Sequence, residues 1–277
     1  MISPHGHGRP FYNLLMEQLL PMLTFLQTAQ DAARIGGRIL QQWQSRFTAR
    51  EKSPANLVTE ADLASQEAIF DFIHTRFPDH KFLGEEGLDH QTGTSEYRWV
   101  IDPLDGTGNY VHGFPYYCVS IGLECRGELI VGVIYDPTRD EMFTAMKGSG
   151  AFLNGQRLLC SEVNQLSEAM CIASLPVKTT SESPAIARFL KVITQAQSVQ
   201  RTGSAALNLC YVTCGRIDAF WSTNLMPWDM AAGVLLVTEA GGQITTTGGG
   251  PFALETPDLL ATNGTALHGQ LSQLLTE

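Results

Sequence analysis

The sequence lacks several features that define whole classes of protein. No apolar run is long enough to suggest a membrane-spanning helix, so we expect no membrane partner. The first residues show no basic region followed by an apolar core, the pattern of a secretory signal, and we therefore expect a cytoplasmic location. No internal repeat or low-complexity tract stands out.

Paired cysteines and an excess of positive charge are also absent. The six cysteines form no Cys-x-x-Cys pair, and Cys210 and Cys214, one helical turn apart, lack the two further ligands that a metal site requires. Lys and Arg number 18 against 28 Asp and Glu, which gives a net charge of −10. A nucleic-acid binder needs a basic face, so we expect no nucleic-acid partner. Small phosphorylated substrates remain compatible, because bound divalent ions reverse the local field.

The most informative feature that is present is an apolar strand that leads into two carboxylates and a glycine turn. Val100 and Ile101 are typical of a strand, and we expect Pro103 to end it because proline has no backbone donor. Asp102 and Asp105 then lie where the strand stops. Gly106 allows close approach to a ligand, and residues 107–109 can open a helix whose first N–H groups face an anion. The same composition also fits a plain surface turn.

Two further junctions repeat this acidic character. Glu85 and Glu86 follow the apolar segment 82–84, and Asp229 stands at the start of a predicted helix after Pro227. Three such junctions favour a metal and phosphate site over chance turns.

The periodicity of apolar residues predicts how distant acids converge. Helical spacing predicts helices over 22–43 and 61–77, and short runs at 118–124, 129–135 and 141–146 predict consecutive antiparallel strands. The second half predicts a helix over 204–214, a strand over 217–221, a helix over 229–240 and a strand after 242. Helices packed on mixed sheets, an α+β fold, follow from this order. We expect one compact unit of two halves, 1–177 with the main metal motifs and 185–277 completing the site, joined by the polar segment 178–184.

Five motifs in this order resemble the inositol monophosphatase family of Mg²⁺-dependent, lithium-sensitive phosphatases. They are Leu57–Asp62, Gly84–Glu86, Asp102–Thr107, Gly203–Ala206 and Trp228–Gly233, and the resemblance covers most of the chain. It implies the layered α-β-α-β-α sandwich of the sugar phosphatases, which periodicity alone does not choose. It also implies a homodimer and inhibition by lithium.

The resemblance further implies a set of metal ligands. Asp102 is expected to bridge two Mg²⁺ ions, Glu85 and the Leu104 carbonyl to complete the first, and Asp105 and Asp229 to complete the second, with two or three ions in all. Hard oxygen ligands of this kind suit Mg²⁺.

The expected catalytic residues are Thr107, Asp62 and Glu85. By resemblance, Thr107 positions the attacking water and its proton is relayed toward Asp62. A helix-capping hydroxyl and an ordinary acid at a helix start are the alternatives for these two residues. The expected substrate contacts are Asp105, Gly106, Thr107, Gly203, Ser204, Ala205, Ser222 and Asp229.

The expected function is hydrolysis of a small phosphorylated polyol by metal-activated water, with no covalent phosphoenzyme and with inositol 1-phosphate as the first candidate. The family carries a glutamate for inositol hydroxyls shortly before its Trp-Asp motif, whereas the spacing here places Ser222 there. The leaving group therefore stays open: a histidinol-phosphate or nucleotide 3′-phosphatase is an alternative, as is a regulatory binding module that retains the fold. Lys52 and Arg201 are interpreted as solvated surface charges and left out of the site.

Overall fold

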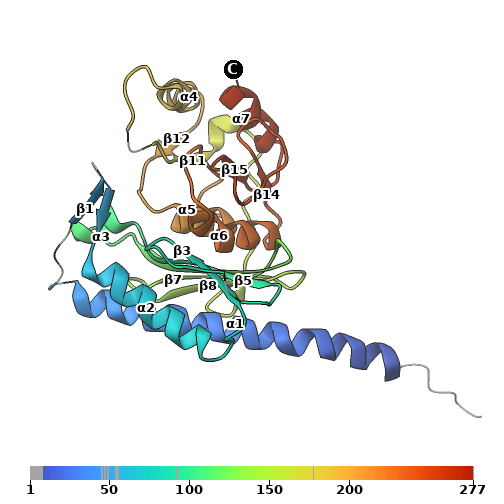
Figure 1. Ribbon diagram of the computed structural model, residues 1–277. Coiled ribbons are helices and arrows are strands. Elements are labelled where there is room, and N and C mark those ends of the chain that lie inside the picture. Colours follow the sequence, from blue (N-terminus) through green and yellow to red (C-terminus); the bar gives the residue numbers. More distant parts are fainter. Residues whose placement is uncertain are drawn as a thin grey trace, which may run out of the picture.

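The computed structural model describes residues 9–44, 46, 48, 50–53, 56–91, 93–176 and 178–276, with side chains left aside at 9–19 and 51–58. The chain forms five layers (Figure 1). Helices α1 (Arg9–Trp43) and α2 (Glu60–His74) cover one face of an eight-stranded sheet, and α5 (Ala205–Thr213) and α6 (Pro227–Glu239) cover the other. A five-stranded sheet and then α4 (Pro184–Ile193) and α7 (Leu267–Thr276) follow. The predicted α-β-α-β-α sandwich is confirmed.

The larger sheet carries the central motif. Its order is β10-β9-β8-β7-β6-β5-β3-β4, and its ladders are antiparallel except for the parallel pair β3 and β5. The strands are β3 (Lys81–Gly84), β4 (Asp89–His90), β5 (Tyr97–Asp105), β6 (Cys118–Cys125), β7 (Glu128–Asp136), β8 (Glu141–Met146), β9 (Gly150–Leu153) and β10 (Gln156–Arg157). The predicted antiparallel run from residue 118 to 146 is confirmed as β6, β7 and β8.

The smaller sheet is mixed, with the order β12-β11-β13-β15-β14. Its strands are β11 (Met170–Ala173), β12 (Ser198–Gln200), β13 (Ala219–Ser222), β14 (Gln243–Thr245) and β15 (Leu259–Thr262). The change of sheet lies between β10 and β11, earlier than the segment 178–184 suggested as a linker. Outside the two main sheets lie the hairpin β1 (Arg50–Ser53) and β2 (Asn56–Val58), the short helix α3 (Thr107–Val111) and the 3-10 turn η1 (Leu166–Glu168).

Two boundaries differ from the sequence prediction. Helix α1 begins at Arg9 rather than Met22 and continues through Pro21, because losing one backbone donor does not end a helix held by its neighbours. Strand β5 was expected to stop at Pro103 but runs to Asp105. Asp102 pairs with Ser120 and Asp105 with Cys118, so three steps on β5 oppose two on β6. This bulge accommodates Pro103, which has no backbone N–H to donate to the ladder.

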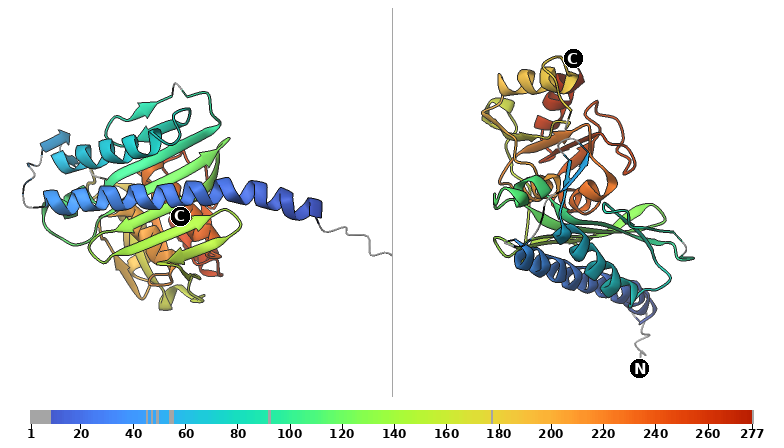
Figure 2. Two further views of the ribbon diagram at one scale, coloured as in Figure 1. Left: turned by 90° about the horizontal axis from the view of Figure 1, so that it is seen from below. Right: turned by 60° about the vertical axis from the view of Figure 1, so that its left-hand side comes forward.

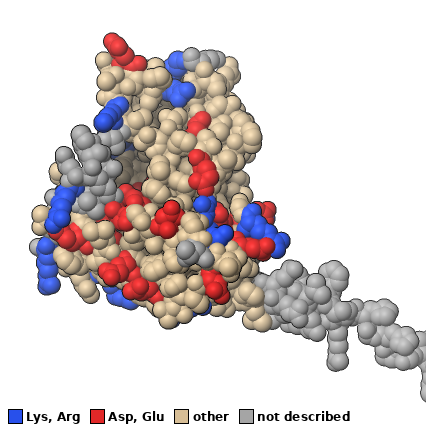
Figure 3. All heavy atoms as spheres, viewed as in Figure 1, with Lys and Arg blue, Asp and Glu red and all other residues tan. Residues whose placement is uncertain are grey.

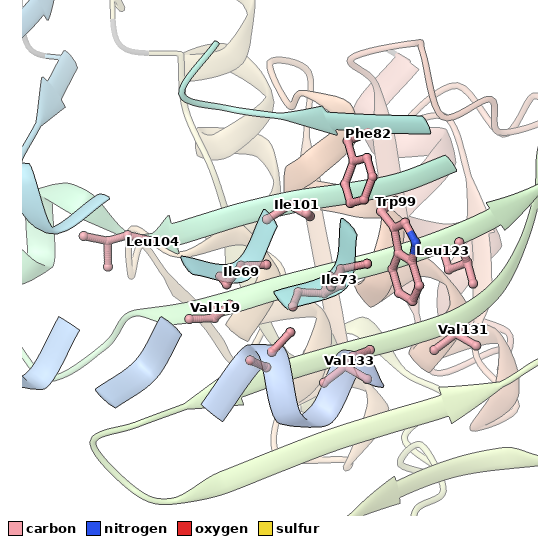
Figure 4. Packing of buried hydrophobic residues seen from close by; sticks show 14 of the residues in the cluster. Ile69, Ile73, Phe82, Trp99, Ile101, Leu104, Val119, Leu123, Val131 and Val133 are labelled. Carbon is pink, nitrogen blue, oxygen red and sulfur yellow. The ribbon is translucent and has the colours of Figure 1, made fainter. Parts of the chain in front are cut away.

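The helices and the large sheet are held together by a dense apolar layer. Figure 4 shows Ile69 and Ile73 of α2 beside Trp99 and Ile101 of β5, and all four side chains are completely buried. Figure 2 shows α1 crossing the strands on the same side of the sheet as α2. Burial of such side chains is worth about 1.5–3 kcal/mol each, and it fixes the strand that carries the acidic motif.

The distribution of surface charge and the hydropathy of the helices both bear on which partners the chain can bind. On the face shown in Figure 3, basic side chains lie singly or in small groups among acidic ones. In the described part of the chain, no helix is both long enough and apolar enough to cross a bilayer.

Candidate active site

Three carboxylates meet at the junction of the large sheet and the central helices. Asp102 and Asp105 come from β5 and Asp229 from the first turn of α6, and one oxygen from each lies within 4.8 Å of the others. Asp102 is 1 % exposed and Asp105 8 % exposed, while Asp229 is half-buried. None of the three pairs with a Lys or Arg in the part of the chain that the structure describes.

This arrangement is electrostatically costly as it stands. Burial raises the pKa of Asp102 well above its usual range, and the charges of Glu85, Asp105 and Asp229 raise it further. Burial likewise raises the pKa of Asp229, with Asp105 as the next cause. Several buried carboxylates without a cationic side chain match the all-oxygen donor set that a divalent cation requires, so the residues fit Mg²⁺.

Glu85 joins this cluster from the end of the neighbouring strand β3. Its N–H donates to the Ile101 carbonyl at 3.3 Å, one residue before Asp102, and its charge is among the causes that raise the pKa of both Asp102 and Asp229. Gln66 of α2 fixes the turn, because its Oε1 accepts the Glu86 N–H at 3.0 Å and its Nε2 donates to the Glu86 carbonyl at 3.1 Å. The structure thus brings the second predicted acidic junction to the first.

The β5 bulge sets the direction of two predicted ligands. The Leu104 N–H donates to Asp102 Oδ1 at 2.9 Å, and the Leu104 carbonyl accepts from the Thr107 hydroxyl at 3.1 Å. After the strand, Gly106 has φ of +95°, and a Cβ there would lie 2.9 Å from the Tyr116 carbonyl oxygen. Glycine is therefore required at this turn, from which α3 begins at Thr107 as predicted.

Thr107 at the start of α3 and Asp62 in the first turn of α2 face each other. The Thr107 Oγ1 lies 3.2 Å from Asp62 Oδ1. Asp62 is fully buried, and its other oxygen, Oδ2, accepts hydrogen bonds from the N–H and hydroxyl of Thr59, which form a capping box at the start of α2. The carboxylate is therefore held in one orientation with Oδ1 aimed at Thr107.

Asp105 has a second set of partners at the start of α5. Its Oδ2 accepts from the Ser204 hydroxyl at 2.5 Å and the Ala206 N–H at 2.6 Å, and its Oδ1 accepts from the Ala205 N–H at 3.2 Å. These bonds lower the pKa of Asp105, although burial raises it more. Of the predicted wall residues, Ser204 and Ala205 are thus tied directly to the acidic cluster.

A cavity of about 230 Å³ opens beside the carboxylates. Of the predicted substrate contacts, its lining includes Asp105, Gly203, Ala205, Ser222 and Asp229; Gly106, Thr107 and Ser204 are not part of it. Ser222 is buried, and its hydroxyl accepts from the Asn224 N–H at 3.4 Å.

The cavity also contains Ser174, Leu175, Asn224 and Leu225, which sequence reasoning missed, and Arg201, which was wrongly left out of the site as a solvated surface charge. Arg201 and Asn224 each stand two residues from a predicted contact, which was the available signal. Ser174 and Leu175 follow β11, a strand that no periodicity predicted.

Comparison with known proteins agrees with the geometry. Residues 21–277 match the model of the inositol monophosphatase family. The chain is 42% identical over 254 residues to inositol monophosphatase 2 of Solanum lycopersicum, covering 87% of this chain and 94% of the relative. It is 37% identical over 261 residues to the Nus factor SuhB of Salmonella typhimurium, covering 93% and 97% of the two chains. The crystal structure of the extragenic suppressor protein suhB from Bartonella henselae superposes with a TM-score of 0.85 at 35% identity, covering 94% and 99%. The chain therefore belongs to the inositol monophosphatase family and is a phosphoric monoester hydrolase.

Proposed function

We propose that the chain is a Mg²⁺-dependent phosphatase that hydrolyses a small phosphorylated polyol, with inositol 1-phosphate as the first candidate. The observation that carries this proposal is the buried cluster of Asp102, Asp105 and Asp229 beside a cavity. Its volume of about 230 Å³ accommodates a small phosphorylated alcohol beside the carboxylates.

The residues that would hold the metal are Glu85, Asp102, Asp105, Asp229 and the Leu104 carbonyl, with two or three ions in the site. Bound Mg²⁺ would neutralise the phosphate charge and lower the pKa of the attacking water. The expected role of these residues is to place that positive charge beside the cavity, where a phosphate dianion would otherwise be repelled.

Thr107 and Asp62 are proposed to handle the proton. The Thr107 hydroxyl lies between Asp62 Oδ1 and the Leu104 carbonyl. When its hydrogen points at Asp62, a lone pair of Oγ1 is left to accept from a water, which fixes the direction of attack. The proton then passes through the hydroxyl to Asp62, and the water attacks phosphorus in line, with no phosphoenzyme.

The substrate end of the site is proposed from the remaining contacts. Gly106 and Thr107 would bind phosphate oxygens through the turn after β5, while Gly203, Ser204, Ala205 and Ser222 form the wall around the alcohol. Ser222 carries no charge at the position where the resemblance expects glutamate, which supports a broader choice of leaving group.

Phosphate release from a substrate panel tests this proposal. The panel is inositol 1-phosphate, histidinol phosphate, fructose 1,6-bisphosphate and adenosine 3′,5′-bisphosphate, each with Mg²⁺ and with EDTA. Mg²⁺-dependent preference for inositol phosphate supports the proposal as stated. Preference for histidinol phosphate, fructose 1,6-bisphosphate or the nucleotide keeps the mechanism and replaces the substrate, and silence from a folded, metal-supplied sample contradicts the proposed activity.

Relatives with the name Nus factor SuhB support a second candidate function, a regulatory role exerted through a protein partner. The complete acidic set supports catalysis beside any such role. Co-purification of a stoichiometric partner at moderate salt tests this candidate.

The remaining expectations form part of the same proposal. They are inhibition by lithium, a homodimer, a cytoplasmic location, no nucleic-acid partner, and the division into halves 1–177 and 185–277. Sedimentation of the purified chain tests the homodimer, and inhibition by lithium at fixed Mg²⁺ tests the ion site.

A further inference from the structure

The cavity beside the acidic cluster has one cationic residue. Arg201 lines it together with the uncharged side chains of Ser174, Ser222 and Asn224, and the only carboxylates in the lining are Asp105 and Asp229. Arg201 is exposed and makes no ion pair or side-chain hydrogen bond within the described part of the chain. Its guanidinium is therefore available to a ligand.

The two carboxylates of the cavity have other partners. Asp105 accepts from Ser204 and the first N–H groups of α5, and Asp229 Oδ2 accepts from the Met226 N–H at 2.7 Å. Both also belong to the cluster that fits metal ions. An anion on the substrate is thus the natural partner for Arg201 in this cavity.

The backbone that carries Arg201 is anchored. Asn109 Nδ2 donates to the Thr202 carbonyl at 2.8 Å and to the Tyr116 carbonyl at 2.7 Å. The Thr202 hydroxyl donates to Asn208 Oδ1 at 2.6 Å, and Asn208 is fully buried in α5. The chain next to Arg201 is therefore fixed to both the motif turn and the central helix, which positions the arginine at the cavity wall.

We infer that Arg201 is a specificity-determining residue that binds a second anionic group on the substrate. Among small phosphorylated polyols, those whose alcohol part carries another negative charge, a carboxylate or a second phosphate, are then favoured over those without one, inositol 1-phosphate included. The planar fork of arginine suits either group. This inference rests on the proposed phosphatase function and deepens it.

The chemistry explains why such a residue matters here. The Mg²⁺ ions would serve the scissile phosphate, so in a chain of net charge −10 a second negative charge on the substrate needs a local partner of its own. A charge-assisted hydrogen bond of this kind corresponds to a change of about tenfold or more in affinity. Its exposure makes the preference sensitive to salt.

Two matched substrate pairs test the inference. Glycerol 3-phosphate and 3-phosphoglycerate differ by a carboxylate, and inositol 1-phosphate and inositol 1,4-bisphosphate differ by a second phosphate. For at least one pair, the wild-type chain should show a kcat/KM about tenfold or more higher for the charged member. Arg201→Gln should remove that preference, because it should lower kcat/KM about tenfold more for the member with the additional anionic group than for the member that carries only the scissile phosphate.

Two variants sharpen the comparison. Arg201→Lys should keep part of the preference, because the charge remains but the bidentate fork is lost. Arg188→Gln in α4 makes the same charge change away from the cavity lining and should leave the ratios unchanged. The inference is overturned if Arg201→Gln lowers both members of each pair equally, or leaves every ratio at its wild-type value.

Binding in EDTA separates this inference from the proposed activity. Both members of a pair carry the same scissile phosphate, so repulsion from the acidic cluster cancels in the ratio of their Kd values. Calorimetry should show that ratio collapse in Arg201→Gln for the pair that is preferred. If the wild-type chain has no phosphatase activity but its Kd ratio collapses in Arg201→Gln, the proposed activity is contradicted and the Arg201 site is kept. If the wild-type chain is active but the kcat/KM and Kd ratios are unchanged in Arg201→Gln, only the Arg201 site is contradicted.

Discussion

The Ser204 hydroxyl donates a 2.5 Å hydrogen bond to Asp105 Oδ2. Asp105 ends β5 in the large sheet, and Ser204 is the N-cap of α5 in the central layer. The same hydroxyl accepts from the Leu207 N–H at 3.3 Å, so it serves the helix and the acidic cluster together. A single side chain thus links the metal-binding motif to the wall of the cavity.

Removal of this hydroxyl should cost both stability and activity. Ser204→Ala loses a helix cap and a charged hydrogen bond, which is about 1–2 kcal/mol of unfolding free energy, or a Tm lower by about 2–8 °C. Ser183→Ala is the control, because Ser183 caps α4 without a side-chain hydrogen bond to that helix. Equal Tm values for the two variants would show that Ser204 does not hold the junction.

The hydroxyl of Thr107 should matter more than its methyl group. Thr107→Val keeps the shape but removes the donor and acceptor, and we expect kcat to fall about 100-fold or more. Thr107→Ser keeps the hydroxyl and should stay within about tenfold of wild type. Initial rates at saturating Mg²⁺ measure both, and a Val variant as active as the Ser variant would show that the Thr107 hydroxyl has no part in catalysis.

The sequence predicts some parts of this molecule well for local reasons. The strands from residue 118 to 146 alternate and are separated by turn residues, so their pairing follows from neighbours in the chain. The acid at the start of α6 and the helix after Gly106 were likewise visible in short motifs.

Other parts depend on contacts that periodicity does not encode. Strand β11 has four residues, and the last three are buried in the second sheet. Its neighbour β12 begins 25 residues after the end of β11. Strand β5 passes Pro103 because a bulge opposite β6 accommodates the proline, and the Leu104 N–H donates to Asp102 Oδ1. Arg201 lines the cavity next to Thr202, which long-range hydrogen bonds with Asn109 and Asn208 hold in place.

The acidic cluster predicts an inverse dependence of stability on pH in the absence of metal. The folded pKa of Asp102 is raised above its ordinary 3.8, so its contribution is complete below that value and is lost as pH rises through the folded pKa. In EDTA, Asp102→Asn should therefore melt a few degrees above wild type at pH 8, with a smaller difference at pH 5.

Mg²⁺ should reverse this order, because it binds the ionised carboxylates only in the folded wild type. Differential scanning calorimetry with and without Mg²⁺ measures both effects. A wild type that gains no stability from Mg²⁺ at pH 8 would argue against a metal site at these residues.

The buried ring of His80 should destabilise the fold in acid. Trp99 Nε1–H donates to His80 Nδ1 at 3.0 Å, and burial lowers the pKa of His80 from 6.5 to about 4. Its stabilising contribution is present above pH 6.5 and is lost as pH falls toward 4, a change of about 2–3 kcal/mol. His80→Phe should flatten the dependence of unfolding free energy on pH in this range, measured by urea titration at several pH values. An unchanged slope would assign the acid sensitivity to other groups.

The central claim is that the buried carboxylates carry a Mg²⁺-dependent phosphatase activity, and phosphate release by Asp102→Asn tests it most directly. The variant should retain the wild-type circular dichroism spectrum, because Asn keeps an oxygen for the Leu104 N–H. Its Mg²⁺-dependent turnover of inositol 1-phosphate, or of the best ester in the panel, should fall at least about 100-fold even at saturating Mg²⁺. Asp71→Asn, the same change at an exposed position of α2, should leave turnover unchanged. A folded Asp102→Asn chain with near-wild-type turnover would contradict the account.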